Sequence, residues 1–111
     1  MKYHPNLQPA RLRAMPWYRQ LAMVDSELSR ACNLLKQGGG AEVSGCLMRA
    51  RELMGVLESQ PVIPEEYGPK LLDVTRLMAI GRFGKSPGDI RDIHATLTSI
   101  YLPAMERSPA A

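Results

Sequence analysis

The chain has 111 residues, a formal net charge of +3 and two cysteines. A chain of this length is expected to form one domain, whose hydrophobic core needs neither disulfides nor a metal. It has no apolar run near the roughly 20 residues that a membrane-spanning helix requires, and residues 1–13 lack the apolar segment of a signal peptide. We therefore expect a cytoplasmic protein with no membrane partner.

Residues 1–15 are expected to form an extended N-terminal arm, because they contain Pro5 and Pro9 and show no helical period. Tyr3 and Leu7 are the side chains of this arm that would contact the rest of the chain or a partner. Four basic residues precede the first acidic one. Such an arm suits RNA, an acidic membrane or an acidic protein, or it only solubilises the chain, and we favour the last role.

The first helix is expected to run from Pro16 to the glycines at 38–40. Proline suits the first turn of a helix, where its missing N–H is not needed. Apolar residues then recur every three or four positions and define one face: Trp17, Leu21, Val24, Leu28, Ala31 and Leu35. Glycine readily adopts the backbone conformations that end a helix. So short a connection predicts that the first two helices are antiparallel neighbours.

A second helix is predicted over residues 41–58, with an apolar stripe wide enough for an interior helix. The stripe consists of Val43, Cys46, Leu47, Ala50, Leu53, Met54 and Leu57. Cys32 and Cys46 both occupy apolar helix positions. We interpret them as reduced core residues of a reducing compartment, with a disulfide between the two neighbouring helices as the alternative.

The third helix follows a link at residues 61–64 that must be extended, because each of its two prolines restricts the residue before it. Residues 65–67 are expected to form a single turn before the helix begins at Gly68. The apolar face of this helix comprises Leu71, Val74, Leu77 and Met78, with Leu72 and Ile80 at its edges.

The fourth helix is expected to begin at Pro87, with Ser86 as its N-cap and Asp89 as the acidic residue of a capping box. Pro103 is expected to end it. Its apolar face comprises Ile90, Ile93, Leu97 and Ile100.

Four amphipathic helices with short links predict an all-α protein, an antiparallel up-and-down four-helix bundle over residues 16–104. The extended arm at residues 1–15 precedes the bundle. A C-terminal tail is expected at residues 105–111.

No catalytic, metal or cofactor site is predicted. Cys46 and His94 could meet in the core, but both occupy helix-face positions, and His94 adjoins the apolar face of the fourth helix as a boundary histidine would. Two cysteines and two histidines without i, i+3 or i, i+4 spacing make a poor metal site. We therefore expect a protein that is not an enzyme.

Nucleic-acid binding is the weaker of the binding alternatives. Residues 81–85 are basic and include Phe83, which would suit contact with a phosphate backbone. The surrounding chain lacks stacking aromatics and a recognition-helix motif, so a solvated basic turn is favoured. The glycines at 38–40 likewise lack the Lys-Ser/Thr pair of a nucleotide-binding loop.

Methionine is unusually frequent, with seven residues in the chain, most of them in or beside predicted helices. Flexible thioether side chains fill gaps in cores, and they also form adaptable surfaces for partner helices. Core filling is favoured for most of them. Met48 is the discriminating position, because an exposed methionine stripe would form a groove for an amphipathic helix. The candidate partner-binding residues are Tyr3, Leu7, Met23, Met48, Met54 and Met78.

Residues 47–53, Leu-Met-Arg-Ala-Arg-Glu-Leu, resemble a Leu-x-Arg-Ala-x-acidic-apolar signature of the flagellin-specific export chaperones of the bacterial flagellar system. Residues 25–28 resemble the aspartate-containing middle of that family's first helix, and residues 87–101 resemble its short last helix. The chain departs from the family at residues 23–25, which read Met-Val-Asp where the family has Leu-Tyr-Asp. The resemblance extends over residues 20–102.

This resemblance implies a non-catalytic chaperone without a cofactor. Such a protein would bind the amphipathic terminal helices of a flagellin-like client and keep them from assembling prematurely. The alternative is a helical protein-interaction module of another purpose, homodimeric or with a different partner. The client and the oligomeric state are left open by the sequence.

Overall fold

The computed structural model describes residues 8–60, 63–79 and 87–107. These residues contain five α-helices and one short 3-10 helix and no strand, so the prediction of an all-α protein is confirmed. The elements are α1 Pro9–Arg13, α2 Trp17–Lys36, α3 Ala41–Glu58, η1 Glu65–Tyr67, α4 Gly68–Ala79 and α5 Pro87–Arg107.

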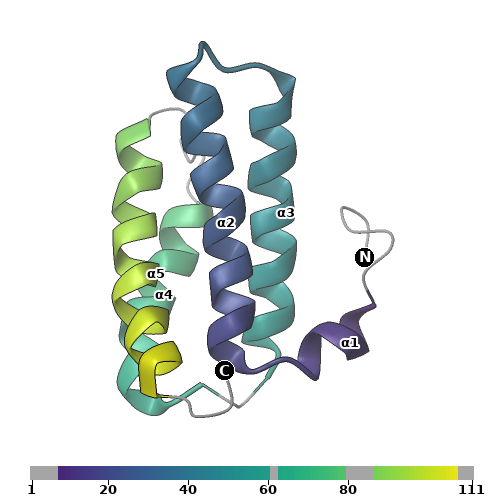
Figure 1. Ribbon diagram of the computed structural model, residues 1–111, viewed down its shortest axis with the longest axis vertical. Coiled ribbons are helices and arrows are strands. Elements are labelled where there is room, and N and C mark those ends of the chain that lie inside the picture. The colour runs from purple at the N-terminus through teal and green to yellow at the C-terminus, as the bar shows by residue number, and fades with distance from the viewer. Residues whose placement is uncertain (1–7, 61–62, 80–86, 108–111) are drawn as a thin grey trace.

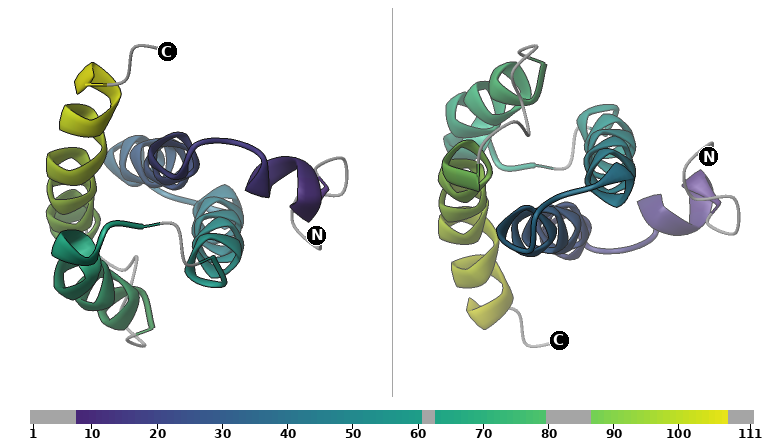
Figure 2. Two further views of the ribbon diagram at one scale, coloured as in Figure 1. Left: turned by 90° about the horizontal axis from the view of Figure 1, so that it is seen from below. Right: turned by 90° about the horizontal axis from the view of Figure 1, so that it is seen from above.

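Helix α2 lies at the centre of the arrangement, between α3 and α5, and packs extensively against both (Figure 2). Helices α2 and α3 run in opposite directions along the long axis of the molecule, and α5 also runs opposite to α2 (Figure 1). Helix α4 lies against α5, and α1 lies against α3. This arrangement is compatible with the predicted four-helix bundle.

The turn between α2 and α3 is made by three glycines whose backbone only glycine adopts readily. The φ angles of Gly38, Gly39 and Gly40 are 109°, 79° and 129°, in the region that side chains with a Cβ atom avoid. The Gly39 N–H donates to the Leu34 carbonyl at 2.8 Å and so satisfies one of the last carbonyls of α2. The predicted helix end and antiparallel hairpin are confirmed.

The core follows the predicted helical periods closely. Every residue of the predicted α3 stripe is buried, as are the four predicted positions of α5. The central positions of the α2 stripe are buried too, while Trp17 and Leu35 at its two ends are half-buried against the core. Cys32 and Cys46 are buried free thiols, so the disulfide alternative is wrong.

One predicted core position of α4 is exposed. Leu71, Val74 and Met78 are buried, but Leu77 is 43% exposed. Helix α4 packs mainly against α5 and η1, so only a narrow stripe of its surface is covered. Leu77 lies outside that stripe, and its assignment to the inner face was wrong.

The prediction of an extended arm is wrong for Pro9–Arg13, which form helix α1. Pro9 occupies the first turn, where proline is tolerated, and the residues after it are good helix formers. The side chain of Leu12 is completely buried. Burial of this one leucine against the core gives the short helix a tertiary contact that local patterning does not reveal.

Pro103 does not end α5, which continues to Arg107. A proline inside a helix leaves the carbonyl four residues earlier, here that of Ser99, without its N–H partner. Ser99 and Pro103 are both exposed, so water can hydrate that carbonyl. The Arg107 guanidinium also donates to the Pro103 carbonyl at 3.2 Å and to the Tyr67 hydroxyl at 3.0 Å, and these bonds hold the last turn.

Several predictions fall on residues outside the described part of the chain: the Ser86 cap, the edge position Ile80 and the basic turn at residues 81–85. Helix α5 begins at Pro87 and η1 forms the single turn expected at residues 65–67. Of the helices in the described ranges, none is both long and apolar enough to span a bilayer.

Candidate partner-binding groove

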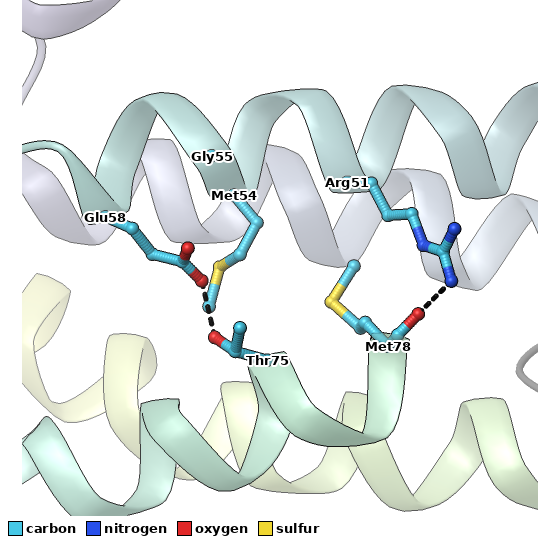
Figure 3. A pocket seen from close by; sticks show the side chains of 6 residues that line it. All are labelled: Arg51, Met54, Gly55, Glu58, Thr75 and Met78. Atoms are coloured by element: carbon cyan, nitrogen blue, oxygen red, sulfur yellow. Dashed lines mark hydrogen bonds between the residues drawn. The ribbon is translucent and has the colours of Figure 1, made fainter. Parts of the chain in front are cut away.

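A pocket of about 320 Å³ opens between α3 and α4 (Figure 3). Its walls come from two helices that are consecutive in the chain but do not pack closely against each other. The residues lining it are Arg51, Met54, Gly55, Glu58, Thr75 and Met78. The floor is apolar and the edges carry charged and hydroxyl groups, so the pocket itself is amphipathic.

The floor consists of two methionine side chains, one from each helix. Met54 of α3 points toward α4, and Met78 of α4 points toward α3 (Figure 3). Both are almost fully buried. The unbranched thioether side chain changes rotamer at little cost, so this floor can adapt its shape to side chains of an incoming ligand.

Polar contacts at the two ends of the groove tie its walls together. The Arg51 guanidinium donates to the backbone carbonyl of Met78, in the last turn of α4. There it satisfies a carbonyl that has few intrahelical partners. At the other end the Thr75 hydroxyl lies within hydrogen-bonding distance of the Glu58 carboxylate and of the Leu71 carbonyl. The groove therefore has a defined width.

Gly55 makes the groove accessible. It is exposed, and a Cβ atom built at this position meets no other atom within 4 Å. Its helical conformation does not require glycine, and an alanine there would favour the helix by about 1 kcal/mol. The missing side chain leaves space on the α3 wall, which makes Gly55 a suitable position from which to block the groove.

Of the four predicted partner-binding residues that the structure describes, two line the groove, Met54 and Met78. Met23 lies on α2, half-buried against the core. Met48 is half-buried on α3 and does not line the pocket. Its spacing of three and seven residues from Arg51 and Gly55 nevertheless places it on the same flank of α3. Tyr3 and Leu7 lie outside the described residues.

A second polar feature, missed at the sequence level, joins α2 to α5. Asp25 is only 3% exposed, and its carboxylate accepts hydrogen bonds from three side chains of α5. The Tyr101 hydroxyl and His94 Nδ1 each lie 2.5 Å from it, and the Thr98 hydroxyl lies at 3.5 Å. The sequence carried a signal, because residues 94, 98 and 101 are spaced to fall on one helix face.

This cluster separates the two groups that were considered as a catalytic pair. His94 binds Asp25, whereas the Cys46 thiol lies 3.3 Å from Nη2 of Arg49 on α3. Burial raises the pKa of the Cys46 thiol, although the nearby Arg49 guanidinium opposes the shift. A buried thiol with a raised pKa holds its proton, so Cys46 is not prepared as a nucleophile. Among the described residues no group of three or more His, Cys, Asp or Glu side chains is placed to hold a metal.

Tyr101 gives the protein a predicted sensitivity to alkaline pH. Burial, together with the hydrogen bond to Asp25, raises the pKa of Tyr101. The folded state therefore binds this proton more tightly than the unfolded chain does, and stability falls as pH rises above the ordinary tyrosine pKa of about 10. Tyr101→Phe should flatten the fall in the urea midpoint between pH 9 and 11, while costing about 1 kcal/mol at neutral pH. If the urea midpoints of the wild type and of Tyr101→Phe fell in parallel over this pH range, the coupling between the Tyr101 proton and folding would be contradicted.

No family model, curated protein or solved structure matches the chain. The resemblance to flagellin export chaperones therefore stays a prediction.

Proposed function

We propose that the protein is a non-catalytic chaperone or adaptor whose groove between α3 and α4 binds an amphipathic helix of a client protein. In this proposal α2, α3, α4 and α5 form an antiparallel four-helix bundle that serves as the scaffold. The observation that carries the proposal is the methionine floor of Met54 and Met78 beneath an open α3 wall at Gly55. The methionines supply an adaptable apolar lining, and the missing side chain at Gly55 leaves room for a client side chain to enter.

The occupant is a helix because the groove runs between two helices and is apolar at its centre. Its size suits the side chains of one helix face and not a whole helix. A client helix would place apolar side chains, spaced three and four residues apart, against the methionines. Leu72, 50% exposed and one turn before Thr75 on α4, would extend the apolar contact beyond the pocket.

Charge fixes a further property of the client. Glu58 is exposed at one end of the groove and carries the negative charge there. A lysine or arginine beside the apolar face of the client would pair with it, contributing up to about 1 kcal/mol at low salt. The resemblance at residues 47–53 supports a flagellin-like client, and the buried free thiols of Cys32 and Cys46 fit a reducing compartment such as the cytoplasm.

Blocking the groove tests the proposal. Gly55→Phe adds a ring into open space on the α3 wall and should leave the fold intact. It should weaken binding of a flagellin C-terminal helix peptide by at least tenfold, which is a loss on the order of 1.4 kcal/mol in binding free energy. The matched control, Ala95→Phe, adds the same ring at an exposed position of α5 outside the groove. Titration calorimetry should show binding to the wild type and to the control with a negative heat-capacity change.

Two peptides separate the client from the mode of binding. The second peptide is a designed amphipathic helix with a flanking lysine. If this peptide binds to the wild type but not to Gly55→Phe, the adaptor function is supported. If the flagellin peptide does not bind in the same experiment, the prediction of a flagellin client is wrong. If neither peptide binds at a concentration of tens of micromolar, or if Ala95→Phe is as damaging as Gly55→Phe, the groove is not the binding site.

A substitution at Glu58 tests the charge of the client. Glu58→Gln keeps an oxygen that can accept from Thr75 but removes the negative charge. We expect binding of the lysine-bearing peptide to weaken several-fold at low salt, with the difference disappearing near 1 M salt, where the Debye length is about 3 Å. An unchanged affinity at low salt would contradict pairing with a basic client residue.

Self-association is a second candidate, favoured by the large apolar side chains that α4 and α5 expose. Leu72, Leu77 and Leu102 are each between 43% and 50% exposed. In a homodimer a second copy would cover part of this surface. Light scattering over a range of protein concentrations distinguishes this function, because only the dimer predicts a concentration-dependent doubling of mass without a client.

A further inference from the structure

A second pocket, separate from the groove, lies between the C-terminal half of α2 and the first turns of α5. It has a volume of about 260 Å³ and shares no lining residue with the groove. It is lined by Leu28, Ser29, Cys32, Asn33, Lys36, Ile90, Arg91 and His94. These side chains fall into an apolar group and a group of hydrogen-bond donors.

The donors of this pocket carry positive charge. Lys36 from α2 and Arg91 from α5 supply the basic side chains, and Ser29 and Asn33 add a hydroxyl and an amide. None of the described residues that line it is acidic. Arginine and lysine are the side chains that proteins commonly use to bind phosphate oxygens.

His94 is held in place by the Asp25 cluster. Its Nδ1 is 2.5 Å from the Asp25 carboxylate, so Nε2 is the ring nitrogen left for a ligand. An N–H at Nε2 could donate to a phosphate oxygen. Asp25 does not line this pocket, but it lines an adjoining pocket that shares Ser29, Asn33 and His94 with it. Its carboxylate is also engaged by Tyr101 and Thr98, which lowers its repulsion of an anion.

The two helix ends near the pocket carry opposite partial charges. Ile90 and Arg91 lie at the start of the 21-residue helix α5, whose positive dipole end attracts anions. The negative end of α2 would oppose this effect. Its last carbonyls are occupied, however, because the N–H groups of Gln37, Gly38 and Gly39 donate to carbonyls of residues 33–35.

The apolar side of the pocket selects against a bare ion. Leu28 and Ile90 are completely buried and Cys32 nearly so. They lie behind the accessible lining of the pocket, which is itself more apolar than polar and offers few partners to a small hydrated anion. We propose that this pocket binds a small organic phosphomonoester. The phosphate would lie among Lys36, Arg91 and His94, and the organic group against the apolar lining in front of Leu28 and Ile90.

Phenyl phosphate is the probe that tests this site. Titration of the full chain, followed by ¹H–¹⁵N NMR, should give saturable shifts at the amides of Ser29, Asn33 and Ile90. Lys36→Gln and Arg91→Gln should each weaken binding by about tenfold, as expected for loss of a charge-assisted hydrogen bond. Lys70→Gln removes the same charge from exposed α4 and should leave the affinity within twofold. Lys36 and Arg91 are both exposed, so these variants should fold, which circular dichroism would verify.

Inorganic phosphate and phenol complete the experiment. Both should bind more weakly than phenyl phosphate, because each satisfies only one side of the pocket. Equal affinity for inorganic phosphate and phenyl phosphate would overturn the assignment to an organic phosphate. Two results would overturn the site itself. One is chemical-shift changes that do not saturate by 20 mM phenyl phosphate, which corresponds to a binding free energy on the order of −2.3 kcal/mol or weaker. The other is a loss of affinity in Lys70→Gln as large as that in Lys36→Gln.

Discussion

Asp25→Ala is expected to destabilise the protein by roughly 2–3 kcal/mol, because it removes the acceptor of three hydrogen bonds that join α2 to α5. The carboxylate is buried, so its solvation must come from these donors. The donors themselves are partly exposed: 44% of the His94 side chain is accessible and can be rehydrated after the change. This accessibility keeps the expected loss below the largest values seen for broken buried pairs.

Two further variants show whether the hydrogen bonds cause the loss. Asp25→Asn keeps one acceptor oxygen and should cost less than Asp25→Ala. Asp92→Ala, at an exposed position of α5, should change stability by no more than about 0.5 kcal/mol. Urea unfolding measures all three. In a double-mutant cycle, Asp25→Ala and Tyr101→Phe should be less than additive, since both remove the same bond. Fully additive losses of unfolding free energy in the cycle, or equal losses for Asp25→Ala and Asp92→Ala, would show that the hydrogen bonds of Asp25 do not stabilise the fold.

The sequence predicted the hydrophobic core well because helical period is a local property. The whole α3 stripe from Val43 to Leu57 could be read from spacing alone, and every member is buried. The same method failed at Leu77, because its exposure depends on how little of α4 the other helices cover. It also failed at Pro103, where solvent exposure of the freed carbonyl allows the helix to continue.

The polar interactions were beyond the sequence because their partners are distant in the chain. Asp25 contacts residues that follow it by 69 to 76 positions. Gln20 and Gln60 similarly exchange two amide hydrogen bonds, at 2.8 and 3.3 Å, across 40 positions. A buried polar residue on an otherwise apolar helix face is unremarkable until the facing helix is known.

Two of the predicted partner-binding residues line the candidate groove, and that they bind a partner stays a prediction. Methionine frequency pointed to an adaptable surface, and Met54 and Met78 do meet in one pocket. Which methionines meet depends on the placement of α4 relative to α3, and no local pattern encodes that placement. Sequence spacing does not indicate a role for Gly55, because its place on the open wall of the groove depends on the position of α4.

Leu21→Ala is the second substitution with a large expected effect, roughly 2–5 kcal/mol of lost stability. Leu21 is completely buried on α2, the helix that packs extensively against both α3 and α5. The cavity left by alanine would therefore weaken packing at the centre of the molecule. Domains of this kind have total stabilities of about 5–15 kcal/mol, so the variant should lose a large fraction of its stability and show a much lower urea midpoint.

Leu72→Ala is the matched control, since it makes the same chemical change at a side chain that is 50% exposed on α4. Away from the core such a substitution should cost no more than about 0.5 kcal/mol. Because Leu72 would extend the client-binding surface, the same variant should bind the client peptide more weakly while keeping its fold. Comparison of Leu21→Ala with Leu72→Ala therefore distinguishes an effect on core packing from an effect on client binding. If Leu72→Ala were as destabilising as Leu21→Ala, α4 would be packed more tightly than the structure indicates, and the groove beside it would be closed.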